Sequence, residues 1–320
     1  MIELLMAGAI LAAPGQQPQT PSPAAQLDGP VTLSDVTVTG RPLQDLIRSF
    51  VVEVAEPNRH RGLARWDERV CVGVANLRPE TGQFLADRIS TVATDLGLDA
   101  GAPGCTPNIL IVATDDANAL TRTLVEERRR AFRMGGAGMD RGGDALEDFV
   151  ETARPVRWWQ MSIPTDSQTG EPAIRIPGHC SGRCERSYDF APNIAVFAAS
   201  RVRTQIVDNL SRAIVIVDVD EVSHLSMMQL ADYVAMVSLA QIDPDADTRA
   251  FASILNVMKD PSAADGLMEW DRAYLDGLYG AERNRKHQRA QRGEVVDSIE
   301  AAHRRARAAE DTEGGEGVAD

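Results

Sequence analysis

The segment from Ala213 to Val219 restricts the fold of this chain more than any other. It reads Ala-Ile-Val-Ile-Val-Asp-Val, which is the most strand-like run in the sequence and almost continuously apolar. A strand with one face in water alternates apolar and polar side chains, whereas a strand buried on both faces does not. We therefore expect residues 213–219 to form a central strand of a sheet.

A strand, helix, strand order precedes this segment. Residues 71–74 and 108–112 are strand-like, and apolar side chains follow a helical spacing from residue 81 to residue 96. Such a crossover favours two adjacent, parallel strands. Similar patterns predict strands at 31–40, 158–163 and 194–199, and helices at 42–54, 117–133, 226–241, 248–258 and 264–279. The expected fold class is α/β or α+β, with a mixed sheet and packed helices.

Composition divides the chain into four parts. We expect a signal peptide at 1–13, a disordered tether at 14–30, a single α/β domain at 31–280 that could divide near 135–150, and a polar helix with a disordered acidic tail at 281–320. The tether is rich in Pro, Gln, Ser and Ala, as flexible linkers are.

The N-terminus favours export. Residues 4–13 are ten small or apolar residues, which suits a signal peptide cleaved near Ala12 or Ala13. The segment before them contains Glu3 and no Lys or Arg. A misplaced start codon and an ordinary disordered tail are therefore the alternatives. No other apolar stretch approaches the roughly 18 residues of a membrane span, so we expect no transmembrane helix.

The four cysteines also favour export to the periplasm or the medium, because an even count is typical of disulfides in periplasmic or secreted proteins. Cys71 opens one strand-like run and Cys105 directly precedes another, so neighbouring strands would bring these two together. We predict a Cys71–Cys105 disulfide, with Cys180 and Cys184 closing a short loop. The alternative is a metal site made by His179 with both thiols of that loop, but it lacks a fourth ligand.

The charge of the chain opposes nucleic-acid binding. Acidic residues outnumber Lys and Arg by 47 to 33, giving a net charge of −14. An anionic surface repels phosphate backbones. The Arg-rich stretches at 126–130 and 303–307 have acids among or beside them, as solvated helix faces do.

The histidines provide no recognisable catalytic motif. They stand at His60, His179, His224, His287 and His303, without a His-x-x-x-His pair or a His-Glu-x-x-His motif. A serine nucleophile sits in a Gly-x-Ser-x-Gly turn. The nearest match, Gly178 to Gly182, has one residue too many before Ser181.

Acidic residues cluster at the end of the apolar run, where α/β sheets often place functional groups. Asp218, Asp220 and Glu221 could hold a cation or act as acid and base, with His224 close behind. The interpretation we favour is a polar strand exit followed by a helix cap at Ser223 or Ser226.

A second acidic segment begins like a calcium-binding loop. Residues 243–247 read Asp-Pro-Asp-Ala-Asp, but Thr248 stands where the loop needs Gly and Ile254 where it needs Glu. We expect a turn followed by a helix cap.

Several short segments together resemble a known family. Residues 66–74 read Trp-Asp-Glu-Arg-Val-Cys-Val-Gly-Val and are followed by an amphipathic helix, by Asp-Leu-Gly-Leu at 95–98 and by Asn-Ile-Leu-Ile-Val at 108–112. This order resembles the N-terminal half of zincin-like secreted bacterial proteins of unknown function.

The resemblance continues to about residue 280. The counterparts are Trp158-Trp159, the 213–219 run, the 226–241 helix, Ser253-Ile254-Leu255-Asn256, and Asp271, Leu275 and Leu278-Tyr279. It implies a zincin-like scaffold with zinc ligands on the 226–241 helix. Here that helix contains no His or Glu, and Asp232 is its only acid. Because zinc hydrolysis needs metal ligands and a general base, the resemblance implies a member that has kept the scaffold without the chemistry.

The function expected from these features is that of a non-catalytic periplasmic or secreted protein. It would bind a protein or envelope partner and need no cofactor. One alternative is a hydrolase of an unrecognised kind, such as a divergent metallopeptidase that uses Asp218, Asp220, Glu221 or His224. Another is an interaction module that works through the acidic C-terminal helix.

Overall fold

The structure is a computed structural model that describes residues 42–67, 69–133, 138–176, 194 and 200–316, with side chains described as far as residue 305. All of these residues belong to one unit, Arg41–Asp320. The helices are α1 Leu43–Val54, α2 Pro79–Asp95, α3 Ala117–Glu127, α4 Arg129–Phe132, α5 Gly143–Glu151, α6 Met227–Leu239, α7 Glu269–Gly280 and α8 Gln288–Glu316, with a short 3₁₀ helix at Ile254–Asn256. The strands are β1 Arg69–Val70, β2 Val72–Ala75, β3 Asp99–Ala100, β4 Ile109–Thr114, β5 Val156–Asp166 and β6 Ile206–Asp218.

The main sheet has the order β2-β4-β6-β5. Strands β2, β4 and β6 are parallel, and β5 pairs antiparallel with β6, so the sheet is mixed and the fold is α/β. The β2-α2-β4 crossover and the central place of the 213–218 segment confirm the two main sequence predictions. The apolar pattern of that segment suits its place, because β6 has a neighbouring strand on each edge and helices on each face.

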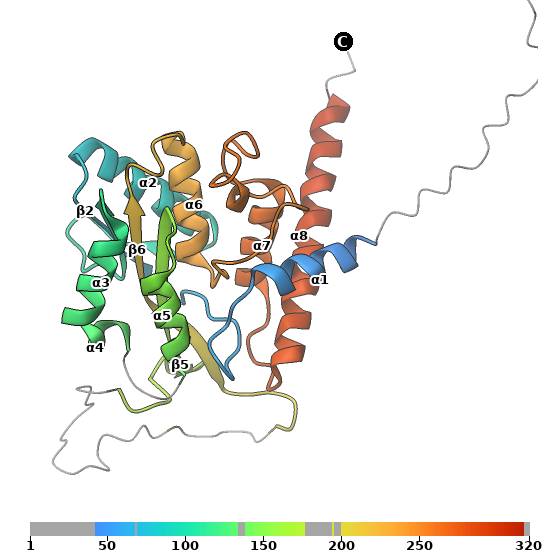
Figure 1. Ribbon diagram of the computed structural model, residues 1–320. Helices are drawn as coiled ribbons and strands as arrows, with labels where there is room; N and C mark the ends of the chain where they lie inside the picture. The colour runs from blue at the N-terminus through green and yellow to red at the C-terminus, as the bar shows by residue number, and fades with distance from the viewer. Residues whose placement is uncertain (1–41, 68, 134–137, 177–193, 195–199, 317–320) are drawn as a thin grey trace, which may run out of the picture. The chain divides into compact units, whose positions relative to one another are not determined.

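Alternate residues of β6 enter different parts of the core. Val215 and Val217 pack with α2, α6 and the C-terminal helices, whereas Ile214 and Ile216 pack with α3 and α5. Figure 1 shows α3 and α5 on one side of the sheet and α2 and α6 on the other. This two-sided burial explains why the strand is apolar at nearly every position.

The predicted helix at 248–258 is wrong. Only Ile254–Asn256 is helical, as a single 3₁₀ turn. The Asn256 side chain donates to the carbonyls of Thr248 and Phe251 and accepts from the Thr248 hydroxyl. An Asn side chain that takes backbone partners in this way competes with a helix. The predicted 117–133 helix also differs, because it is interrupted at Arg128 between α3 and α4.

The helix after residue 280 is less solvated than its polar sequence suggests. Val295, Val296 and Ile299 of α8 are buried, and α8 packs on α7 and α1. Widely spaced apolar residues at helical positions are enough to create one buried face. The expected strands at 31–40 and 194–199, the signal peptide and the tether lie largely or wholly outside the described residues. No helix in the described part of the chain is long and apolar enough to cross a membrane.

Candidate functional site

Asp218 ends β6 with both carboxylate oxygens engaged by the backbone. One oxygen accepts from the Ala117 amide at the start of α3 (3.1 Å) and the other from the Glu221 amide (3.3 Å). Asp218 is buried, whereas Asp220, Glu221 and His224 are exposed in the turns that follow. The Asp218 carboxylate therefore fixes the strand exit to a helix N-terminus.

Ser226 caps the next helix, as one of the two favoured caps. Its hydroxyl accepts from the Gln229 amide (3.1 Å), and the Gln229 side chain accepts from the Ser226 amide (2.8 Å). This reciprocal capping box satisfies two amides at the start of α6. Every residue of α6 from Gln229 to Leu239 is buried.

The only acid of α6 is held by an ion pair. Asp232 is bound by the Arg88 guanidinium of α2 (2.5 and 3.1 Å) and accepts from the Leu267 amide (2.8 Å). The hydrogen bond to Asp232 raises the pKa of Arg88. Asp232 thus joins α2, α6 and the segment before α7. Among the described residues, no group of three or more His, Cys, Asp and Glu side chains could hold a metal ion; His179 lies outside them.

A third buried carboxylate connects two segments that carry the zincin-like resemblance. Asp271 of α7 accepts from the Ser253 hydroxyl (2.6 Å) and from the amides of Ile254 (2.7 Å) and Met268 (2.9 Å). Burial raises the pKa of Asp271 to about 6. The hydrogen bonds lower this pKa, but their effect is smaller than that of burial. The side chain is fully enclosed, so it stabilises the loop before α7 and is closed to a substrate.

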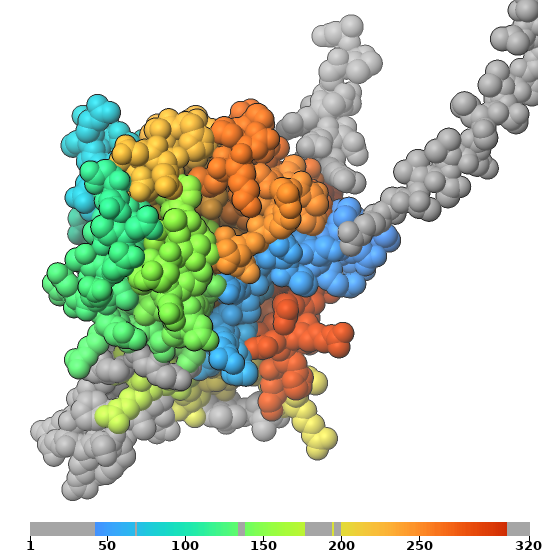
Figure 2. Space-filling view, in the orientation of Figure 1, coloured from blue at the N-terminus to red at the C-terminus, as the bar shows by residue number. Residues whose placement is uncertain are grey.

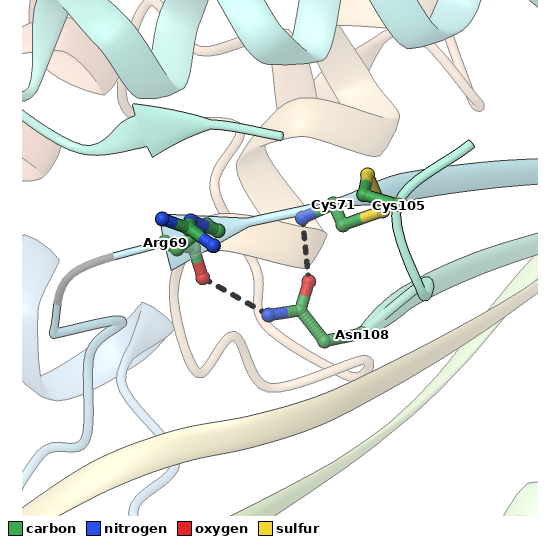
Figure 3. Close-up of a disulfide and its surroundings, with 4 residues drawn as sticks. All are labelled: Arg69, Cys71, Cys105 and Asn108. Atoms are coloured by element: carbon green, nitrogen blue, oxygen red, sulfur yellow. Dashed lines mark hydrogen bonds between the residues drawn. A yellow bond between two sulfur atoms is a disulfide. The ribbon is translucent and has the colours of Figure 1, made fainter. Parts of the chain in front are cut away.

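The predicted disulfide between Cys71 and Cys105 is present (Figure 3). The Asn108 side chain beside it accepts from the Cys71 amide (2.7 Å) and donates to the Arg69 carbonyl (2.9 Å). Together these contacts anchor the junction of β1 and β2 to the start of β4. Cys180 and Cys184, the second predicted pair, lie outside the described residues.

A pocket of about 350 Å³ opens between the start of β5 and α6. We call it the β5–α6 pocket. Its walls are residues 152–156 with Trp158, Tyr233 of α6, and the segments 242–246, 255 and 258–259. Figure 2 shows this face, where α5 and the start of β5 (green) adjoin the segment after α6 (orange). The volume lies in the range of small-molecule sites.

Aromatic rings form the base of the β5–α6 pocket. Trp158 and Tyr233 meet edge to face, with 6.2 Å between ring centroids, and the Trp158 indole donates to the Ile242 carbonyl (3.0 Å). Burial raises the pKa of Tyr233, so its hydroxyl stays protonated and can donate a hydrogen bond. Leu255 and Met258 add apolar surface.

Two of the four charged residues that line the pocket, Arg154 and Asp245, are paired with each other. Arg154 binds Asp148 (3.1 Å) and Asp245 (2.7 Å). Burial alone would lower the pKa of Arg154, but hydrogen bonds to Asp245 and attraction to Asp148 raise it. Lys259, at the rim, is exposed and forms no salt bridge within the described part of the chain. The arrangement suits a small ligand with a ring or apolar body and a polar group near the rim.

No pattern in the sequence indicates this pocket. The sequence predicts a strand at 158–163, a helix at 226–241 and a turn at 243–247, and no motif in it contains Arg154 or Lys259. No local spacing could have joined them, because residues about one hundred positions apart form the walls. The aromatic pair Trp158 and Tyr233, in a chain with only 5% aromatic residues, was the available signal.

No family model, curated protein or solved structure matches this chain. The zincin-like relation therefore stays a prediction.

Proposed function

We propose that this chain is an exported, non-catalytic protein that binds a small, partly aromatic or apolar ligand in the β5–α6 pocket, on a zincin-like scaffold. The observation that carries the proposal is a pocket of ligand size with an aromatic base, in which Arg154 is already paired with Asp148 and Asp245. A general acid or base must be free to exchange a proton with the substrate. Arg154, Asp148 and Asp245 instead hold one another.

Two further acids are engaged in the same way as the Arg154 group. Asp218 holds two backbone amides, and Asp232 is bound by Arg88. A zinc peptidase would present its ligands from the helix that corresponds to α6, and the acid found there is enclosed in an ion pair. Export is supported by the Cys71–Cys105 disulfide, because such bonds persist in oxidising compartments.

A thermal-shift screen of the full chain tests the binding proposal. We expect a compound with an aromatic or apolar body to raise the Tm by about 5 °C at a hundredfold excess over its Kd, since that excess stabilises the folded state by about 2.7 kcal/mol. Ala153 is exposed and lines the pocket, so Ala153→Trp should fill the pocket with little effect on folding. This variant should lose the shift.

The matched control is Ala119→Trp on α3, where the alanine is also exposed but lies outside the pocket. It should keep the full shift. Equal shifts in Ala153→Trp and wild type would place the ligand elsewhere and contradict the proposal. Turnover of a peptide or ester substrate that Asp218→Asn abolishes would contradict its non-catalytic part.

A further inference from the structure

A second hollow lies where α1 meets the first half of α8. We call it the α1–α8 groove. Its volume is about 660 Å³, and its lining consists of Arg48, Val51 and Val52 from α1 and Arg289, Arg292, Gly293 and Val296 from α8. Figure 1 shows α1 crossing α8 at this end of the molecule. The groove is separate from the β5–α6 pocket and shares no lining residue with it.

The groove is cationic in an acidic protein. Three arginines and no acidic residue line it, although acids outnumber bases by 47 to 33 in the whole chain. Arg289 and Arg292 form no salt bridge within the described part of the chain. Arg48 pairs with Asp45 at 3.4 Å, but both side chains are at least half exposed, and such a pair contributes little. All three guanidinium groups are therefore available to an anion.

The floor of the groove is apolar. Val51 and Val296 are only 1% and 5% exposed at its base, whereas Val52 is 60% exposed at the α1 side. Gly293 leaves the α8 side open, because a Cβ added there would meet no atom within 4 Å. An inorganic anion could use the arginines but would leave the valines without a partner.

We propose that the α1–α8 groove binds a single anionic amphiphile, a carboxylate or phosphate head group on an apolar chain. Guanidinium groups bind carboxylate and phosphate oxygens in a bidentate manner, which accounts for three arginines at one site. The valines would bury the first part of the chain. A flat membrane surface fits less well, because the floor is recessed and only Val52 protrudes.

Calorimetric titration of the full chain with sodium dodecanoate, kept below its micelle concentration, tests this site. We expect one-to-one binding. Comparison with octanoate and decanoate should show Kd tightening by about fourfold for each methylene that the groove buries. Dodecanol, which has the chain without the charge, should bind at least tenfold more weakly, and acetate should not bind.

Two groove variants and two control variants locate the binding. Arg289→Gln/Arg292→Gln should weaken dodecanoate at least tenfold, and Gly293→Leu should abolish binding by filling the groove. Leu is a good helix former and the site around Gly293 is open, so α8 should fold; circular dichroism checks this. The matched control, Arg129→Gln/Arg130→Gln, removes two exposed arginines from α4. It should bind like wild type, as should Ala153→Trp.

Three results would overturn the proposal. The first is dodecanoate binding that none of the groove variants changes. The second is no binding of dodecanoate at millimolar concentration. The third is association with phosphatidylglycerol vesicles, or with an acidic peptide, in the absence of one-to-one dodecanoate binding.

Discussion

At the scale of single residues, three buried aspartates have structural roles. Asp218 holds a helix N-terminus, Asp232 an arginine, and Asp271 a hydroxyl and two amides. The sequence located Asp218 at the end of a strand and favoured a capped exit, and the cap at Ser226 is confirmed. The partners of Asp232 and Asp271 come from other elements, so residue type and spacing could not reveal them.

Asp271 should give the protein a distinctive pH dependence. Its folded-state pKa, about 6, is raised above the ordinary value of 3.8, so the folded state binds the proton more tightly than the unfolded state. Its stabilising contribution is complete below pH 3.8 and is lost as pH rises through about 6. Lowering the pH from 7 to 5 should therefore add on the order of 1 kcal/mol to the free energy of unfolding through this group.

Urea unfolding of Asp271→Asn measures this contribution. The amide can accept from the Ile254 and Met268 amides and donate to Ser253, but it does not titrate. The gain between pH 7 and pH 5 should be smaller in the variant than in wild type. Asp271→Ala, which leaves the amides without an acceptor, should cost about 2–5 kcal/mol at either pH. Equal gains in wild type and Asp271→Asn would show that Asp271 is ionised throughout.

At the scale of elements, periodicity predicted the buried strands and the long amphipathic helices well. It was wrong where side chains replace backbone hydrogen bonds, as Asn256 does. It predicted the polar helix that α8 forms but did not indicate that a few residues of this helix are buried. The α7–α8 contact depends on Gly277. A Cβ there would lie 2.7 Å from the Ile299 amide nitrogen and 2.8 Å from its Cα. These are backbone atoms, which cannot move without displacing α8.

Two glycine-to-alanine substitutions should therefore have opposite effects. Both positions are inside helices, where alanine is favoured over glycine by about 1 kcal/mol. At Gly293, where the added methyl group meets nothing, the free energy of unfolding should rise by about 0.5–1 kcal/mol. At Gly277 the clash with Ile299 should outweigh this gain and destabilise the protein by about 1–3 kcal/mol. Urea denaturation followed by circular dichroism measures both values, and a stabilised Gly277→Ala would refute the close α7–α8 contact.

At the scale of the whole molecule, the sequence predicted the fold class and one disulfide. It predicted neither the β5–α6 pocket nor the α1–α8 groove. The central strand and the crossover are local patterns, and Cys71 and Cys105 follow from adjacent strands of the sheet. The β5–α6 pocket and the α1–α8 groove are made where elements distant in sequence meet, so packing alone creates them. Of the segments that chemical motifs single out, only the calcium-loop-like one at 243–247 contributes to either site, through residues 243–246 of the β5–α6 pocket.

Native mass spectrometry of the protein recovered from the extracytoplasmic fraction of its own cells tests the proposed function most directly. The account predicts a chain that lacks about its first 13 residues, with Cys71 and Cys105 oxidised and a small molecule bound. The bound molecule should persist in Ala119→Trp and be lost in Ala153→Trp. A full-length chain in the cytoplasm with four free thiols would contradict export, and equal ligand occupancy in Ala153→Trp and wild type would contradict binding in the β5–α6 pocket.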